Sequence, residues 1–329
     1  MRQEDPLLIF YAEPETDRWL PLDRYLRRLV RRLARGRPQP GGMARYFLNL
    51  QAGLDRLAFP YRVNDYAHAR RHPRHVIGVV GKAHVLRETA WDNPIVFGPA
   101  VPSHPVSDLD LIRNRPVRRI LVSCHWMKAM YDTVWPGMAS VWAAGIDTDR
   151  WSPTAVSSKA VDVLLYDKIR WNRDQYDTEL LNPVLKRLKT AGLVVEVLRY
   201  GTYREEEYQA ALDRARCMIF LCEHETQGFA YLQALSSGVP IMAWDRGGYW
   251  QDPAFFPHAV QFAPVSSVPY WDERCGVKFQ DAEEFATRFE EFWECCQALH
   301  YSPRSYVTEN LALEKCAEKY VHILRSVES

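Results

Sequence analysis

The sequence predicts an α/β protein with two domains, each built on a parallel sheet. The chain has 329 residues, which corresponds to about two domains at ~100–200 residues each. Apolar residues make up 47% of it and charged residues 25%, the balance of a globular protein. Short apolar runs rich in β-branched residues alternate with segments of helical composition, which is the pattern of βαβ units.

The alternation is clearest in the second half of the chain. The strand candidates are residues 161–166 (VDVLLY), 193–198 (LVVEVL), 217–222 (CMIFLC) and 241–244 (IMAW). The helix candidates are residues 182–191, 204–214, 229–237, 282–296 and 309–327. Asn182 is the predicted N-cap of the first of these helices, because Pro183 follows it and Gly192 closes the segment.

The first half is less regular but similar. Its strand candidates are residues 7–11, 76–80, 95–97 and 120–123, and its helix candidate is 43–57. The joint between the halves lies near residues 151–153. We therefore predict an N-terminal Rossmann-like domain over 1–150 and a C-terminal one over 151–305. The last segment, 306–329, is predicted to be a helix and is a candidate to cross back to the first domain.

Several classes of protein are not indicated. No stretch approaches the ~18 consecutive apolar residues of a membrane span. The N-terminus has no basic n-region followed by an apolar h-region, so a secretory signal is not expected. The seven cysteines form no CxxC pair, which favours reduced thiols in a cytoplasmic protein. Two Asp-x-Asp triplets, at 108–110 and 147–149, are a common pattern, and no metal site is predicted.

The near-neutral net charge of +1 conceals an asymmetry. Residues 1–150 carry 23 Lys and Arg against 15 Asp and Glu, whereas residues 151–329 carry 19 against 26. The two halves therefore face different partners, or each other.

A basic amphipathic segment, residues 18–37, accounts for much of the positive charge. Apolar residues recur there at helical spacing, and no acid interrupts Arg24, Arg27, Arg28, Arg31, Arg32, Arg35 and Arg37. Such a face binds anionic lipid, so contact with an anionic membrane surface is one interpretation. A core-packed helix with a solvated basic face and a site for an anionic soluble glycan are the alternatives. Nucleic acid is not an expected partner, because the segment has no recognised binding motif.

Ligands of open parallel sheets bind beyond the carboxyl ends of the strands, where helix N-termini present free amides. The segment after VDVLLY carries three cations, Lys168, Arg170 and Arg173, which suit a pyrophosphate. A solvated basic loop is the alternative. The segment after CMIFLC, 223–229, combines acids with Gly228 at a helix start, so it suits an anion and sugar hydroxyls. Alternatively, Glu225 only complements the helix dipole.

Further candidates follow other strands. Gly247 and Gly248 form a glycine turn with an aromatic wall after IMAW, and Gly41 and Gly42 precede the 43–57 helix as a second glycine loop. Three histidines of the first half follow strands or lie in a Pro-rich loop, and each is a candidate active-site group or a structural residue. They are His84, His104 and His125.

These pieces together resemble the donor-binding half of the retaining GT-B glycosyltransferases of family 4. The run from Glu225 to Ala234 (ETQGFAYLQA) is similar to the family's Glu-x-x-Gly-Phe motif. The family's other motifs have counterparts along the chain in the family's order, at 41–46 (GGMARY), 144–153 (AGIDTDRWSP), Gly238-Val-Pro and Gly247-Gly248. The resemblance spans residues 41–250. The chain departs from the pattern at Gln233, where the family usually has Glu.

The resemblance implies two Rossmann-like domains facing a cleft, and retaining transfer of a sugar from a nucleotide-sugar to an acceptor hydroxyl. It implies no cofactor besides that co-substrate. Lys168 and Arg173, with Arg170, would stabilise the leaving diphosphate, and Glu225 would orient the sugar. The remaining donor contacts that it implies are Gly41, Gly42, Gln227, Gly228, Phe229, Ala230, Gln233, Gly247 and Gly248.

His84 is the preferred first-domain histidine in this reading. The acceptor is expected to be a lipid-linked or anionic glycan, at the inner face of a membrane. One alternative is a degenerate GT-B protein that binds a nucleotide-sugar or glycan without catalysis. Gln233 and the short first domain favour it, whereas the retained Glu225, Lys168 and Arg173 oppose it. A GT-B epimerase or phosphorylase is a further alternative.

Overall fold

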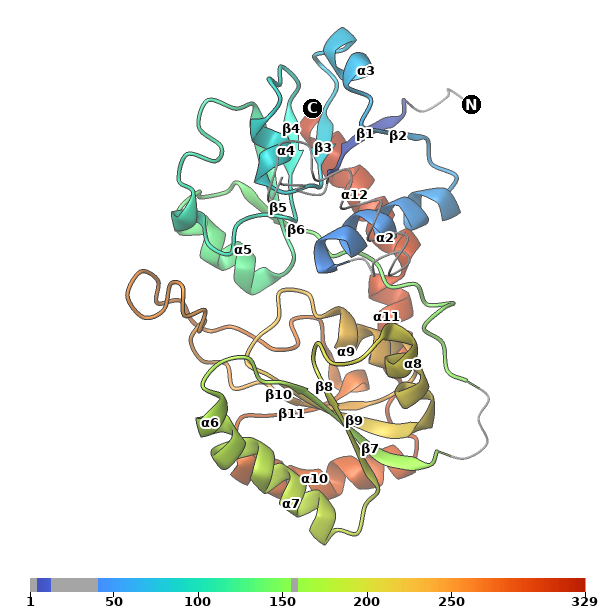
Figure 1. Cartoon of the computed structure of the whole chain (residues 1–329). Coiled ribbons are helices and arrows are strands. Elements are labelled where there is room, and N and C mark those ends of the chain that lie inside the picture. The colour runs from blue at the N-terminus through green and yellow to red at the C-terminus, as the bar shows by residue number, and fades with distance from the viewer. Residues whose placement is uncertain (1–4, 13–40, 155–158, 329) are drawn as a thin grey trace, which may run out of the picture. The chain divides into compact units, whose positions relative to one another are not determined.

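The computed structural model describes residues 5–12, 41–154 and 159–328 (Figure 1). The chain divides into two compact units. The first comprises Met1–Ser123, Lys128–Gly145 and Leu313–Ser329, and the second comprises Cys124–Met127 and Ile146–Ala312. The arginines of the basic segment, Arg24 to Arg37, lie outside the described residues.

The first unit holds a parallel sheet of short strands. In chain order they are β1 (Leu7–Phe10), β2 (Tyr61–Val63), β3 (Ile77–Val79), β4 (Ile95–Phe97), β5 (Val117–Val122) and β6 (Ala139–Val141), arranged as β2-β1-β3-β4-β5-β6. The helices along this part of the chain are α2 (Gly42–Arg56), α3 (Tyr66–Arg71), α4 (Ala83–Arg87) and α5 (His125–Asp132). Strands β1, β3 and β4 are fully buried, as expected for a parallel sheet covered on both faces.

The second unit holds a parallel sheet in the order β11-β10-β9-β7-β8. Its strands are β7 (Val161–Lys168), β8 (Val195–Arg199), β9 (Ala215–Cys222), β10 (Ile241–Trp244) and β11 (Gly276–Phe279). Its helices are α6 (Arg173–Tyr176), α7 (Asn182–Thr190), α8 (Glu205–Arg214), α9 (Phe229–Ser236), α10 (Ala282–Gln297) and α11 (Pro303–Leu311). The predicted α/β architecture with two parallel sheets is confirmed.

The strand order of the second sheet creates a switch point. From β7 the chain moves to one side to form β8, and then returns to the other side of β7 to form β9. The connections leaving β7 and β9 therefore run in opposite directions, which opens a crevice between their carboxyl ends. This is the place in an open parallel sheet where ligands bind.

Helix α7 begins at Asn182 as predicted, but Asn182 is a helical residue and not the N-cap. Helix α6 begins at Arg173, and a π-helical turn, Asp177–Leu181, joins it directly to α7. Pro183 lacks a backbone N–H and cannot make the normal bond inside a continuous α-helix. The wider π turn precedes it immediately and accommodates the proline without ending the helix.

The last helical segment is broken at Ala312. Ala312 has non-helical dihedrals and pairs with Ile146, whose N–H donates to the Leu311 carbonyl at 2.7 Å. Beyond it, α12 (Leu313–Glu328) returns to the first unit and packs on α2. This close packing requires glycine at position 53 of α2. A Cβ there would lie only 2.8 Å from the Cβ of Ala317, which is too close for two carbon atoms.

Tyr320 of α12 offers a test of this packing. Its side chain is fully buried and its ring lies 5.0 Å from that of Trp142, but its hydroxyl has no hydrogen-bond partner within the described residues. Tyr320→Phe keeps the ring and removes the unsatisfied group, so the free energy of unfolding should rise by about 1 kcal/mol. Tyr320→Ala, the control, should lower it by about 3–5 kcal/mol. Urea denaturation measures both, and a Phe variant less stable than wild type would contradict the prediction.

Candidate functional site

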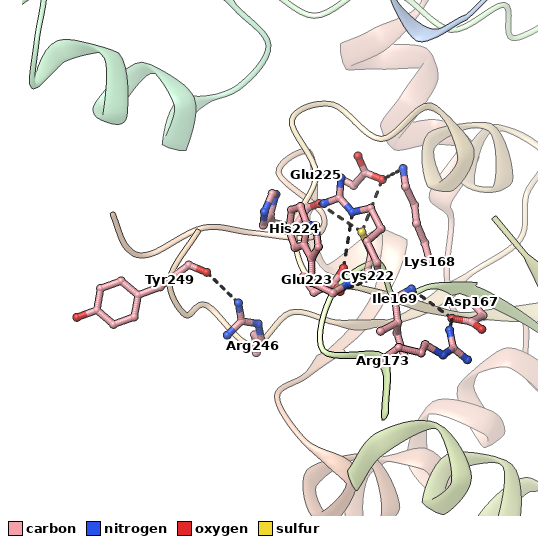
Figure 2. Close-up of polar contacts among 12 residues, drawn as sticks. Asp167, Lys168, Ile169, Arg173, Cys222, Glu223, His224, Glu225, Arg246 and Tyr249 are labelled. Carbon is pink, nitrogen blue, oxygen red and sulfur yellow. Dashed lines mark hydrogen bonds and ion pairs between the residues drawn. The ribbon is translucent and has the colours of Figure 1, made fainter. Parts of the chain in front are cut away.

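Three polar segments of the second unit meet at one edge of its sheet. Strands β7, β9 and β10 end at Lys168, Cys222 and Trp244, and all are parallel. The register pairs Lys168 with Cys222 and Trp244 with Leu221, so the three strands end almost level. The segments that follow them therefore gather at the carboxyl edge, beside the switch point (Figure 2).

An ion pair between Lys168 and Glu225 lies at this edge. The ammonium of Lys168 donates to Oε1 of Glu225, and the two side chains are only 12% and 10% exposed. The ammonium also lies 4.3 Å from the centroid of the Tyr200 ring. Burial by itself lowers the pKa of Lys168, but the carboxylate of Glu225 outweighs it and the pKa is raised. The edge therefore holds a fixed cation and a fixed anion side by side in a weakly solvated setting.

Glu223 fastens the loop after β7 to the turn after β9. It is buried, and its Oε1 accepts the backbone N–H groups of Arg170 at 2.7 Å and Trp171 at 2.8 Å. Arg170 in turn donates from its guanidinium to the His224 carbonyl at 3.0 Å and lies 4.3 Å from the centroid of the Trp171 ring. No individual role was predicted for Glu223 from the sequence. Its bracing contact was not foreseeable, because its two partners lie more than fifty residues earlier.

Arg173 is held away from this pair by two acids. Its guanidinium donates to Asp167 at 2.7 Å and forms an ion pair with Asp177 at 2.6 Å. Burial works to lower the pKa of Arg173, but these two carboxylates raise it. Figure 2 shows Arg173 with Asp167, apart from the Lys168–Glu225 pair. The structure thus brings Lys168 to Glu225, whereas Arg173 is already neutralised.

Gly228 forms the N-cap of α9 with φ +79°, a conformation that favours glycine. A Cβ there would lie 2.5 Å from Cδ1 of Tyr231, so the position also requires the absence of a side chain. Phe229 opens the helix, and the carbonyl of Ala230 accepts the Tyr208 hydroxyl at 2.7 Å. Gln227 and Gln233, which flank this first turn, are buried.

The third segment is braced by Asp245. Its carboxylate accepts from the Ser267 N–H, the Ser266 hydroxyl and the Lys278 ammonium, at 2.8, 2.9 and 2.8 Å. Gly247, at φ +64°, has open space where a Cβ would be. Gly248 lies against the guanidinium of Arg246, which donates to the Tyr249 carbonyl at 2.8 Å.

The predicted residues of the first half of the chain are spread over several elements, and one of them, His125, falls in the second unit. Gly41 and Gly42 are exposed at the start of α2. His84, on α4, has a buried Nε2 without a hydrogen-bond partner among the described residues. His104 caps a 3₁₀ turn, since its Nδ1 accepts the Val106 N–H at 3.1 Å, and burial lowers its pKa. His125, at the start of α5, is exposed.

Three further features were sought in the described residues: a metal site, a membrane-spanning helix and a cavity. No group of three or more His, Cys, Asp or Glu side chains gathers in them in a way that could hold a metal ion. The described helices include none with the length and apolar character that a bilayer span requires. A cavity of about 590 Å³ in the first unit is lined by residues such as Arg87, Trp91 and Asp108, and it contains none of the predicted site residues.

Comparison with solved structures identifies the fold. No family model and no curated protein sequence matches the chain. Solved structures do. AviGT4, a glycosyltransferase involved in avilamycin A biosynthesis, has a TM-score of 0.57 at 15% identity, with 98% of each chain covered. The fold is that of the GT-B glycosyltransferases.

Two further structures agree over nearly their whole length. The lipopolysaccharide outer core galactosyltransferase WaaB, in its apo form, has a TM-score of 0.55 at 9% identity, covering 97% of this chain and 99% of its own. Sucrose-phosphate synthase from Thermosynechococcus elongatus has a TM-score of 0.54 at 12% identity, covering 98% and 99%. The chain spans only 54% of TarM and 59% of the pneumococcal O-GlcNAc transferase GtfA. The GT-B prediction made from the sequence is confirmed as a statement about fold.

Proposed function

We propose that this protein transfers a sugar from a nucleotide-sugar donor to an acceptor hydroxyl, with retention. The observation that carries the proposal is the Lys168–Glu225 pair at the switch point of a GT-B fold. A departing nucleoside diphosphate needs a cation, and a transferred sugar offers hydroxyls to a carboxylate. The pair supplies both groups from adjacent strand ends.

Binding of the donor would break the ion pair between Lys168 and Glu225. Lys168 would turn to the diphosphate, joined by Arg170, while Glu225 would accept hydroxyls of the sugar. Arg173 contributes directly only if it leaves Asp167 and Asp177, so we assign it the lesser part. The amides of the first turn of α9, from Gly228 to Ala230, would support the phosphate or the sugar. Gln233 would contact the ribose, and Gly247 and Gly248 would lie beside the donor. For His84, Gly41 and Gly42 the proposal rests on the resemblance of the sequence alone.

A nucleotide panel tests the proposal. Thermal shift is measured with UDP, GDP, ADP, CDP and dTDP on wild type and on Lys168→Ala. A ligand at 100 times its dissociation constant adds ~2.7 kcal/mol of stability, so binding is visible as a raised melting temperature. We expect one base to stabilise wild type and not the variant. Stabilisation of neither protein by any nucleotide would contradict the donor site.

A binder without catalysis is the second candidate, and Gln233 favours it. Gln hydrogen-bonds a ribose diol without the charge assistance of the Glu that is usual at this position, which weakens the contact. This candidate predicts nucleotide-sugar binding without release of nucleoside diphosphate on any acceptor. The transferase predicts release that depends on the acceptor.

For the acceptor, we propose a lipid-linked or anionic glycan met at an anionic membrane surface. The support is the run of arginines in residues 18–37, at ~1 kcal/mol per basic residue near an anionic leaflet. Liposome flotation tests it with the full chain. We expect the protein to float with vesicles that contain phosphatidylserine and to stay down with phosphatidylcholine alone. Equal absence from both lipid fractions would remove the membrane from the proposal.

A further inference from the structure

The imidazole ring of His224 is buried, but its two nitrogens make no hydrogen bond within the described residues. Only 4% of the residue is exposed, and neither Nδ1 nor Nε2 has a hydrogen-bond partner among the described residues. Leaving a buried donor or acceptor unpaired lowers stability, and native proteins rarely keep such groups without a use. Two unpaired nitrogens in one ring therefore call for a partner that is not a described protein atom.

The ring lies inside the candidate donor site. It occupies the turn between Glu223 and Glu225, as Figure 2 shows, and lies 5.1 Å from the Trp171 ring between centroids. Its backbone carbonyl is the group that accepts from Arg170. The neighbouring Glu223 bonds this turn to the loop after β7, which positions the backbone that carries His224.

The surroundings keep the imidazole neutral. Burial lowers the pKa of His224 to about 3, and the charges of Arg170, Arg246 and Lys168 act in the same direction. Glu223 and Glu225 are the acids nearest in the chain, and each already pairs with a cation. A neutral imidazole has one N–H donor and one acceptor nitrogen.

We infer that His224 binds a hydroxyl group of the transferred sugar and so contributes to donor specificity. A hydroxyl both donates and accepts, as a neutral imidazole does, whereas a phosphate oxygen at neutral pH only accepts. The cations Lys168 and Arg170 suit the diphosphate, which leaves the uncharged ring and Glu225 for the polyol beside it. The inference rests on the proposed function and names a further contact in the same site.

Calorimetry with three variants tests the inference. The probes are UDP, GDP, ADP, CDP and dTDP and the glucose conjugate of each. His224→Phe keeps a flat ring without nitrogens, while His224→Asn and His224→Gln keep a donor and an acceptor. We expect His224→Phe to bind the free nucleoside diphosphate within about twofold of wild type and its sugar conjugate at least ~10-fold more weakly, the effect of one lost hydrogen bond. Asn or Gln should restore part of the difference.

Stability separates this role from a packing role. His224→Phe removes two unsatisfied nitrogens, so its melting temperature should equal or exceed that of wild type, which excludes misfolding as the reason for weaker binding. Equal weakening of the diphosphate and its sugar conjugate would assign the ring to the nucleotide and overturn the inference, as would unchanged affinity for both. If wild type binds no nucleotide at all, the proposed function fails together with the inference, which is a different result.

Discussion

Glu225→Ala and Lys168→Ala are each expected to reduce sugar transfer by at least ~10²-fold, the scale of losing one electrostatic contact to the transition state. In the proposed function, Lys168→Ala removes the cation that would stabilise the departing diphosphate, and Glu225→Ala removes the carboxylate that would bind the sugar. The rate of nucleoside diphosphate release in the presence of acceptor measures both. Near-normal turnover in two well-folded variants would mean that the site lies elsewhere.

The two variants also change stability, and this must be measured separately. Each variant removes one partner of a nearly buried ion pair and leaves the remaining charge without its partner. The free energy of unfolding is expected to fall by about 3–5 kcal/mol. Glu225→Gln is the milder variant, because it keeps a group that accepts from Lys168. Arg204→Ala is the matched control, since its pair with Glu207 has side chains 75% and 50% exposed and its loss should change stability far less.

Gly228→Ala is expected to have the second large effect. The left-handed backbone at φ +79° costs an alanine roughly 1–2 kcal/mol. The added methyl would also overlap the fully buried ring of Tyr231, whose hydroxyl accepts the Tyr270 N–H at 3.0 Å and cannot move freely. We expect the free energy of unfolding to fall by about 3 kcal/mol or more, and donor affinity to fall with it as the first turn of α9 shifts.

Gly247→Ala is the control for this variant. Gly247 also has a positive φ, +64°, but among the described residues no atom other than those of its chain neighbours lies within 4 Å of the position of its Cβ. It should therefore show the backbone term alone, roughly 1–2 kcal/mol. Urea denaturation of both variants gives the comparison. Equal destabilisation would show that contact with Tyr231 contributes nothing.

Most strands that the sequence predicted are buried on both faces, whereas the partly buried β8 was predicted from its β-branched residues. The runs CMIFLC and IMAW became β9 and β10, because a central parallel strand excludes polar residues along its whole length. Strands β2 and β6 were missed, since they are short and largely not buried, and so lack the apolar run that marks the equally short β3 and β4. The N-cap prediction for Asn182 was wrong because the π-helical turn before Pro183 continues the helix from α6.

The candidate site was also predicted only in part from the sequence. The sequence predicted that the segments after β7, β9 and β10 share an edge, because strand order along βαβ units limits where their ends lie. It could not predict that Lys168 reaches Glu225 while Arg173 turns to Asp167 and Asp177. Spacing along a loop does not determine the direction of a long side chain.

By itself, the sequence determined the α/β class and the polar segments that follow each strand, because these depend on local pattern and chain order, and its resemblance to a known family implied the GT-B fold. Only the tertiary structure decided which charges pair, that Glu223 braces the edge, and that the nitrogens of the buried His224 ring have no hydrogen-bond partner among the described residues. Those features depend on contacts between residues about fifty positions apart, and burial sets both their strength and their charge state.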